Sequence, residues 1–173
     1  ESDFLKSWET KVYFNNIMHR MDDTKRPNVP IHMDMPGWSK TFGYYSHLKA
    51  AFNNHNLLLN INGFYNKSRA EMTMYPEDKS ERLMFMLTWP DVRTLAQALY
   101  LEDQIKLNEN SSLKLSASVT MHQNKVESEF GLNSLQIFYP EMNAEKTRIL
   151  KSLAANYQVD KNGFQAGFGL GYG

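Results

Sequence analysis

The stretch Ser112-Leu113-Lys114-Leu115-Ser116-Ala117-Ser118-Val119-Thr120-Met121-His122 alternates between polar and apolar residues without a break. In an extended chain successive side chains point to opposite faces. The spacing therefore puts the apolar side chains of this stretch on one face: Leu113, Leu115, Ala117, Val119 and Met121. It predicts a β-strand with one apolar face and one polar face that contacts water.

The same alternation recurs along the chain. It forms one apolar face near the C-terminus (Phe164, Ala166, Phe168, Leu170, Tyr172) and others on either side of residue 53 (Phe42, Tyr44, Leu48, Ala50, Phe52; Leu57, Leu59, Ile61, Tyr65). These runs are roughly 10 to 15 residues long, whereas soluble strands average about five or six and a tilted membrane strand needs about 9–11. Their length favours strands that cross a bilayer.

Short and long connections alternate between these runs. Tight polar turns fall at Asn53–Asn56, Asn108–Ser111 and Asp160–Gly163. Long connections are expected at Arg20–Lys40, Glu71–Val92 and Gln123–Lys146. This is how outer-membrane barrels are connected, with short turns on the periplasmic side and long loops outside.

Counting a first strand at Trp8–Ile17, the chain contains about seven strands by this pattern. We expect an all-β fold: an antiparallel, up-and-down transmembrane β-barrel segment with short periplasmic turns and long extracellular loops. Single bacterial chains close barrels with an even number of strands. The pattern also stops inside a strand-like run at Gly171-Tyr172-Gly173, so we expect residues 1–173 to be one part of a larger barrel.

Two segments can also be drawn as helices. Asp91–Lys106 and Ala144–Tyr157 both carry apolar residues at helical spacing, which would make the chain a soluble α+β module. Strands are preferred, because each segment runs directly into a tight turn followed by a clean alternating strand. Pro36-Gly37 and Pro90-Asp91 are predicted to form turns.

Composition excludes several functions. The formal net charge is +0, with no block of lysine and arginine, so nucleic acid is not expected as a partner. No cysteine is present for a disulfide or a thiolate metal site, and no apolar run approaches the roughly 18 residues of a transmembrane helix. Nucleophile, phosphate-binding and zinc-protease motifs are missing, so no enzymatic activity is expected.

The candidate site consists of methionines. Three Met-x-Met pairs occur in the first two long connections and their flanks: Met33/Met35, Met72/Met74 and Met84/Met86. Thioethers joined by imidazole suit Cu(I), and an extended Met-x-Met segment puts both sulfurs on one side. We predict that His32, Met33 and Met35 form one arm of a copper site, which Met72 and Met74 approach from the next connection. Met84 and Met86 are expected to pack as an apolar patch.

Four segments also resemble the barrels of TonB-dependent outer-membrane receptors. They are Trp8-Glu9-Thr10-Lys11-Val12-Tyr13-Phe14-Asn15-Asn16 with the following Met18–Asp23, Ala70-Glu71-Met72-Thr73-Met74-Tyr75-Pro76, Leu99-Tyr100-Leu101-Glu102-Asp103-Gln104-Ile105-Lys106-Leu107, and Gly167-Phe168-Gly169-Leu170-Gly171-Tyr172-Gly173. The resemblance rests on the order and spacing of these segments and covers essentially the whole chain.

The resemblance implies that residues 1–173 are a partial receptor barrel domain without its plug domain, located in the bacterial outer membrane. Such receptors bind a scarce nutrient outside the cell and import it with energy from the TonB complex, which contacts the plug region. The implied partners are the lipid bilayer, the TonB complex and a metal or metal chelate. The cargo could be a copper ion, an iron complex such as a siderophore, or cobalamin, and no resident cofactor is expected. A soluble β-rich binding module and a passive porin-like channel are the alternatives.

Overall fold

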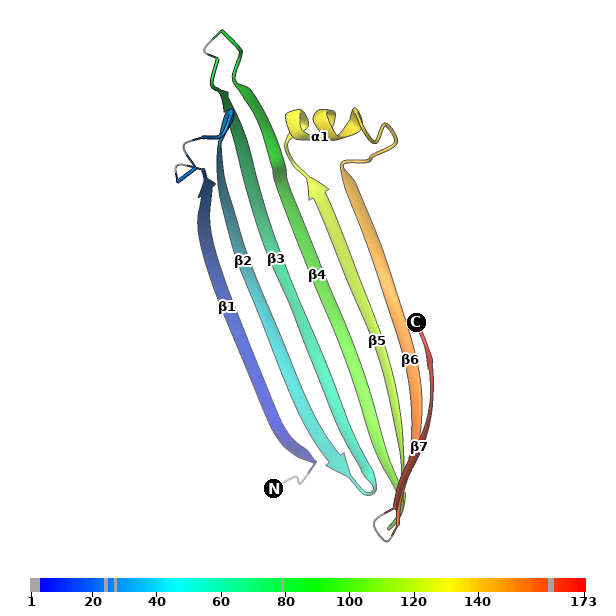
Figure 1. Cartoon of the computed structure of the whole chain (residues 1–173). Coiled ribbons are helices and arrows are strands. Elements are labelled where there is room, and N and C mark those ends of the chain that lie inside the picture. The colour runs from blue at the N-terminus through cyan, green and yellow to red at the C-terminus, as the bar shows by residue number, and fades with distance from the viewer. Residues whose placement is uncertain (1–3, 24, 27, 79, 162–163) are drawn as a thin grey trace.

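The computed structural model describes residues 4–23, 25–26, 28–78, 80–161 and 164–173. Seven strands form one antiparallel sheet in sequence order, and one helix lies between the fifth and sixth strands (Figure 1). The elements are β1 (Leu5–Asp22), β2 (Ile31–Phe52), β3 (His55–Pro76), β4 (Met84–Asn108), β5 (Ser111–Val126), α1 (Glu129–Gln136), β6 (Glu145–Lys161) and β7 (Phe164–Tyr172). The prediction of an all-β chain with about seven antiparallel strands is confirmed.

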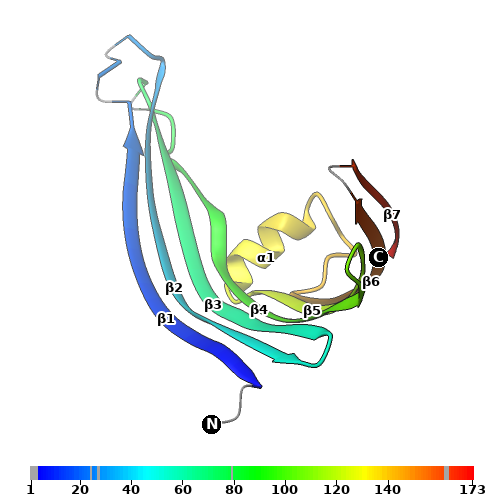
Figure 2. The same cartoon turned by 90° about the horizontal axis from the view of Figure 1, so that it is seen from below.

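The sheet curls strongly around a concave side, on which α1 lies (Figure 2). In the part of the chain that the structure describes, β1 and β7 are the two edges and do not pair with each other. The observed architecture is therefore an open, curved meander. No described helix is long and apolar enough to cross a membrane.

The two ambiguous segments are strands. Residues 91–106 lie within β4 and residues 144–157 lie almost entirely within β6. Two predicted tight turns are present at Asn53-Asn54 and at Glu109-Asn110. Asn53 takes a positive φ of 51°, a conformation that asparagine tolerates better than most residues. Of the third turn, Asn162 and Gly163 lie outside the described residues.

The predicted long loops are largely wrong for the first two connections. Strand β2 already begins at Ile31, β3 continues to Pro76 and β4 begins at Met84, so most of 20–40 and 71–92 is paired sheet. The predicted turn at Pro36-Gly37 is also wrong, because both residues lie within β2. The β2–β3 pairing is interrupted between Asp34 and Gly37 and resumes in the same register, because Pro36 has no N–H to donate.

Pro90-Asp91 is a bulge inside β4 and not a chain-reversing turn. The β3–β4 register shifts on both sides of Ala70, which pairs with Trp89, and Asp91 has a positive φ of 50°. A bulge adds residues to one strand and bends it locally. Pro90 and Asp91 therefore bend β4 locally, and the strand continues on both sides of them.

The third connection contains a helix that the sequence did not predict. Ser128 caps α1, its hydroxyl accepting a hydrogen bond from the Gly131 backbone N–H at 3.1 Å. Gly131 packs against the bulge, where a Cβ on it would lie only 2.0 Å from the Pro90 Cβ. The bulge and the glycine together fix the helix against β4.

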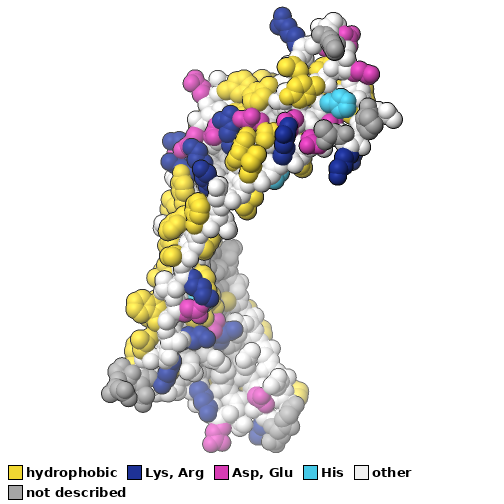
Figure 3. Space-filling model, turned by 90° about the vertical axis from the view of Figure 1, so that its left-hand side faces the viewer, with side chains coloured by type: hydrophobic (Ala, Val, Ile, Leu, Met, Phe, Trp, Pro, Cys, Tyr) yellow, Lys and Arg dark blue, Asp and Glu magenta, His cyan; other side chains and the backbone are white. Residues whose placement is uncertain are grey.

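The two faces of the sheet differ in chemistry. Residues paired across neighbouring strands share a face, so the registers join the predicted apolar runs into one continuous surface. This apolar band contains Phe42, Tyr44 and Leu48 of β2, Leu57, Leu59 and Ile61 of β3, Leu95, Leu99 and Leu101 of β4, Leu113, Leu115 and Val119 of β5, and Phe168, Leu170 and Tyr172 of β7. Seen from the β1 side, hydrophobic side chains line one margin of the lower part of the sheet, whereas at the upper end they lie among charged side chains (Figure 3).

Candidate metal centre

Met33 and Met74 face each other across β2 and β3 as a directly paired couple. The flanking pairs Asp34–Thr73 and Gly37–Ala70 keep a single register, which sets Met35 opposite Met72. Side chains of directly opposite residues have Cβ atoms about 4.5–5.5 Å apart. The structure therefore brings together the four methionines that the sequence predicted as ligands.

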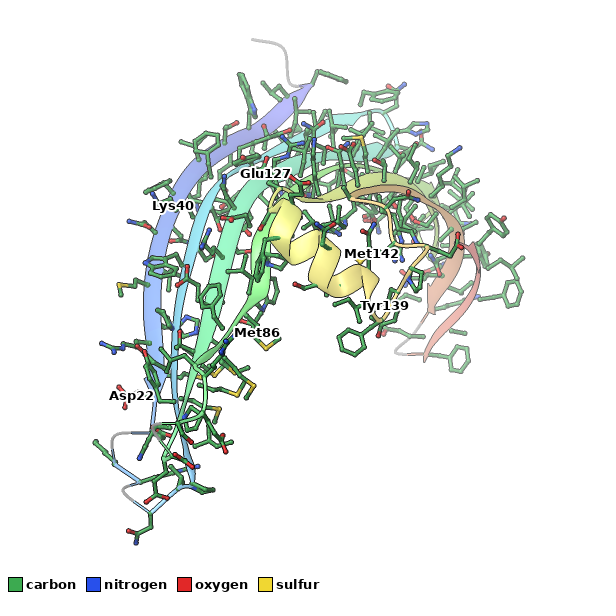
Figure 4. All side chains as sticks on the ribbon, turned by 90° about the horizontal axis from the view of Figure 1, so that it is seen from above. Asp22, Lys40, Met86, Glu127, Tyr139 and Met142 are labelled. Atoms are coloured by element: carbon green, nitrogen blue, oxygen red, sulfur yellow. The ribbon has the colours of Figure 1, made fainter. Side chains whose placement is uncertain are left out.

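The methionine surface extends onto both neighbouring strands. Met72 pairs with Met86 and Met74 pairs with Met84 across β3 and β4, while Met21 pairs with Met35 across β1 and β2. Figure 4 shows Met86 on the concave side of the sheet. We call this surface the methionine face; its members are Met21, Met33, Met35, Met72, Met74, Met84 and Met86.

Several of these side chains are open to solvent. Met33, Met84 and Met86 are 40%, 48% and 42% exposed, and Met21 is 53% exposed. A methionine used as core filler would be enclosed by other side chains. Met84 and Met86, which were expected to pack, are therefore only partly enclosed, and they lie on the same open face as the predicted methionine ligands.

His32 lies on the opposite face of β2 from Met33. Adjacent residues of a strand point to opposite sides, and the His32 Nδ1 atom lies 3.2 Å from Asp23 Oδ1. The other Asp23 oxygen accepts a hydrogen bond from the Met33 backbone N–H at 3.0 Å. This carboxylate therefore fixes the start of β2 and holds His32 away from the thioethers.

His19 is the imidazole that shares the methionine face. It is two residues from Met21 on β1 and pairs with Gly37, which is two residues from Met35 on β2. A Cβ on Gly37 would lie 2.7 Å from the His19 ring, so the ring occupies the space over that glycine. In the sequence, His19 is two residues from Met21, whereas His32 is adjacent to Met33. This spacing could have favoured His19 over His32 as a ligand.

The face is too wide for one ion to contact all seven thioethers. Neighbouring strands are about 4.8 Å apart, so β1 and β4 are separated by roughly 14 Å. A metal ion would bind two or more methionines of adjacent strands, and the face offers several such sets. Among the described residues there is no group of three or more His, Cys, Asp and Glu that could hold a metal ion.

A solved structure has a similar fold. The structure described as "Copper transporter OprC" superposes with a TM-score of 0.75 and 18% sequence identity. The match covers 98% of this chain and 27% of that chain, so this chain spans about a quarter of its length. No family model matches the sequence. No curated protein matches it by sequence either. The chain thus shares its fold with part of a copper transporter.

Proposed function

We propose that this chain is part of the β-barrel of a bacterial outer-membrane receptor, in which the methionine face captures Cu(I) for import. The observation that carries the proposal is the gathering of seven methionines on one face at one end of four neighbouring strands. The proposal has three parts: the strands cross a bilayer, the methionines lie outside it, and their thioethers select copper.

The height of the apolar band supports a membrane location. On β3 the band runs from Leu57 to Tyr65 and ends at Lys67. About nine residues at 3.3 Å each span roughly 30 Å, and a strand tilt of about 40° reduces this to a height of roughly 23 Å. The apolar zone of outer-membrane barrels is about 25 Å tall. The height of the exposed apolar band therefore matches the thickness of the apolar zone of a membrane.

The strands continue well past that band. Strands β2, β3 and β4 have 22, 22 and 25 residues, about twice what a crossing needs. The excess lies at the end opposite the tight turns and carries the methionine face on its concave side. With the tight turns in the periplasm, the methionine face would lie at the outer mouth of the lumen.

Thioether chemistry favours copper over an iron chelate. Soft thioether ligands select Cu(I), whereas harder ions prefer oxygen ligands. The solved structure with the similar fold is described as a copper transporter, although at 18% identity it shows the fold alone. The resemblance to TonB-dependent receptors implies the other parts of the proposal. These are a plug domain, contact of that domain with the TonB complex, and import of the copper without catalysis.

The experiment is a Cu(I) titration of the full-length protein in lipid, in competition with a chelator of known affinity. The variant Met33→Leu/Met74→Leu removes two facing thioethers and conserves side-chain size. Met18→Leu is the matched control, because Met18 pairs with Trp38 on the other face of β1 and is 64% exposed.

Saturable Cu(I) binding that weakens at least about ten-fold in the double variant and is unchanged in Met18→Leu supports the proposal. Equal affinities in all three proteins contradict the assignment of copper to the methionine face.

A further inference from the structure

Four basic residues form a continuous row across four strands. Lys40 of β2 pairs with Lys67 of β3, Lys67 pairs with Arg93 of β4, and Arg93 pairs with Lys125 of β5. We call these four residues the basic row. The registers place them on the same face as the apolar band, at its outer limit: Phe42, Tyr65 and Leu95 lie two residues nearer the tight turns.

Like charges directly opposite each other destabilise a sheet, and the basic row contains three such pairs in succession. Glu127 offsets part of this repulsion, with its carboxylate 2.8 Å from Lys67 Nζ and 3.6 Å from an Arg93 guanidinium nitrogen. Lys125 lies 3.7 Å from Glu145 at the end of the row. Two carboxylates therefore face four cations.

The nearby acidic residues farther from the band have a cation of their own. Arg69 binds both Glu71 and Asp91 at 2.7 Å. The carboxylates of Glu71 and Asp91 are therefore paired with Arg69 and not with the basic row. In the described part of the chain, no carboxylate within salt-bridge distance of Lys40 is observed, and the side chains of Lys67 and Lys125 are 49% and 39% exposed. The row retains an excess of accessible positive charge.

We propose that the basic row binds the phosphate of a lipid headgroup in the outer leaflet, with the lipid's acyl chains lying on the apolar band below. This inference rests on the proposed function, which places the band in a bilayer. A phosphate there would lie between opposed cations and relieve their repulsion. A membrane lipid is the source that the geometry favours, because the cations are continuous with the apolar surface that its chains would cover.

The test measures lipid selectivity at the protein surface by electron spin resonance. The full-length protein is reconstituted in phosphatidylcholine bilayers with a trace of spin-labelled phosphatidic acid or spin-labelled phosphatidylcholine. The variants are Lys40→Gln and Lys125→Gln, which leave the Glu127 ion pairs in place. Lys49→Gln is the matched control, because Lys49 is on the same strand as Lys40 but on the other face, paired with Ser7 and Leu58.

Preferential immobilisation of phosphatidic acid is expected, with a selectivity that falls about five-fold for each cation removed and is unchanged in Lys49→Gln. Equal immobilisation of both lipids by the unmodified protein overturns this inference while leaving the membrane location intact. Displacement of labelled phosphatidic acid by millimolar inorganic phosphate overturns the lipid as the source. Immobilisation of neither lipid contradicts the proposed function itself.

Discussion

Met33 on β2 lies directly opposite Met74 on β3, and Met74 lies directly opposite Met84 on β4. Three methionines from three strands thus form a line across the sheet, and Met35, Met72 and Met86 continue a second line beside it. Because β2, β3 and β4 each contribute a Met-x-Met pair, each of these six thioethers has a second thioether along its own strand and another across the ladder.

Replacement of Met84 and Met86 tests how far the methionine face extends. In the full-length protein, Met84→Leu/Met86→Leu should weaken Cu(I) binding by at least about ten-fold, because the substitution keeps the volume and removes two thioethers of the face. The measurement is the chelator-competition titration, with heat-resistant electrophoretic mobility as the check on folding. An unchanged affinity for Cu(I) would mean that Met84 and Met86 only pack, as expected from the sequence.

The two histidines near the site should behave differently. His19→Ala should weaken Cu(I) binding, because His19 shares the methionine face with Met21 and Met35. His32→Ala should leave the affinity within about two-fold, since His32 lies on the other side of β2 against Asp23. Titration of both variants under one set of conditions makes each the control for the other. A loss confined to His32→Ala would reverse this assignment.

Gly131→Ala tests the contact between α1 and the bulge. Alanine is the better helix former by about 1 kcal/mol, yet its Cβ would lie 2.0 Å from the Pro90 Cβ. Overpacking of this kind costs about 1–3 kcal/mol, so limited proteolysis should cut the connection between β5 and β6 faster than in the unmodified protein. Gly171→Ala is the control, because the nearest atom to its Cβ would be 3.7 Å away. Slower cleavage of Gly131→Ala would mean that α1 does not depend on this close approach.

Glu127 gives the structure a pH-dependent element. Its hydrogen bond with Lys67 lowers the pKa of the Glu127 carboxyl below the ordinary value of 4.5. A depressed pKa contributes stability above the unfolded value, and this contribution is lost as pH falls through the folded one. The thermal midpoint of the unmodified protein should therefore exceed that of Glu127→Gln at pH 7. The difference should shrink as the pH is lowered below about 4.5. A difference that stays constant down to pH 3 would contradict a role for the charge.

Local patterns were sufficient for much of the fold. Period-two alternation at 112–122 and 164–172 predicted strands with one apolar face, and the polar turn at Asn53-Asn54 predicted a hairpin. These features depend on residues that are close in the chain, so a single sequence contains them. The same period applied to His32 and Met33 would have separated them, because neighbours in a strand cannot share a face.

Other features depend on pairing between distant segments. Pro36-Gly37 and Pro90-Asp91 have turn composition, but hydrogen bonding to neighbouring strands carries the sheet past both. The alignment of the methionines and of the basic row is set by cross-strand register. That register depends on the lengths of connections and on the bulge near Asp91, neither of which local composition determines.

X-ray absorption at the copper edge tests the central claim most directly. The sample is the full-length protein loaded with one equivalent of Cu(I), compared with its Met33→Leu/Met74→Leu variant. We expect at least two sulfur scatterers around copper in the unmodified protein, and fewer in the variant. Both replaced residues are methionines of the methionine face, so sulfur lost with these two substitutions would be its thioether sulfur. A shell of nitrogen and oxygen alone around copper in the unmodified protein would contradict copper capture by this face.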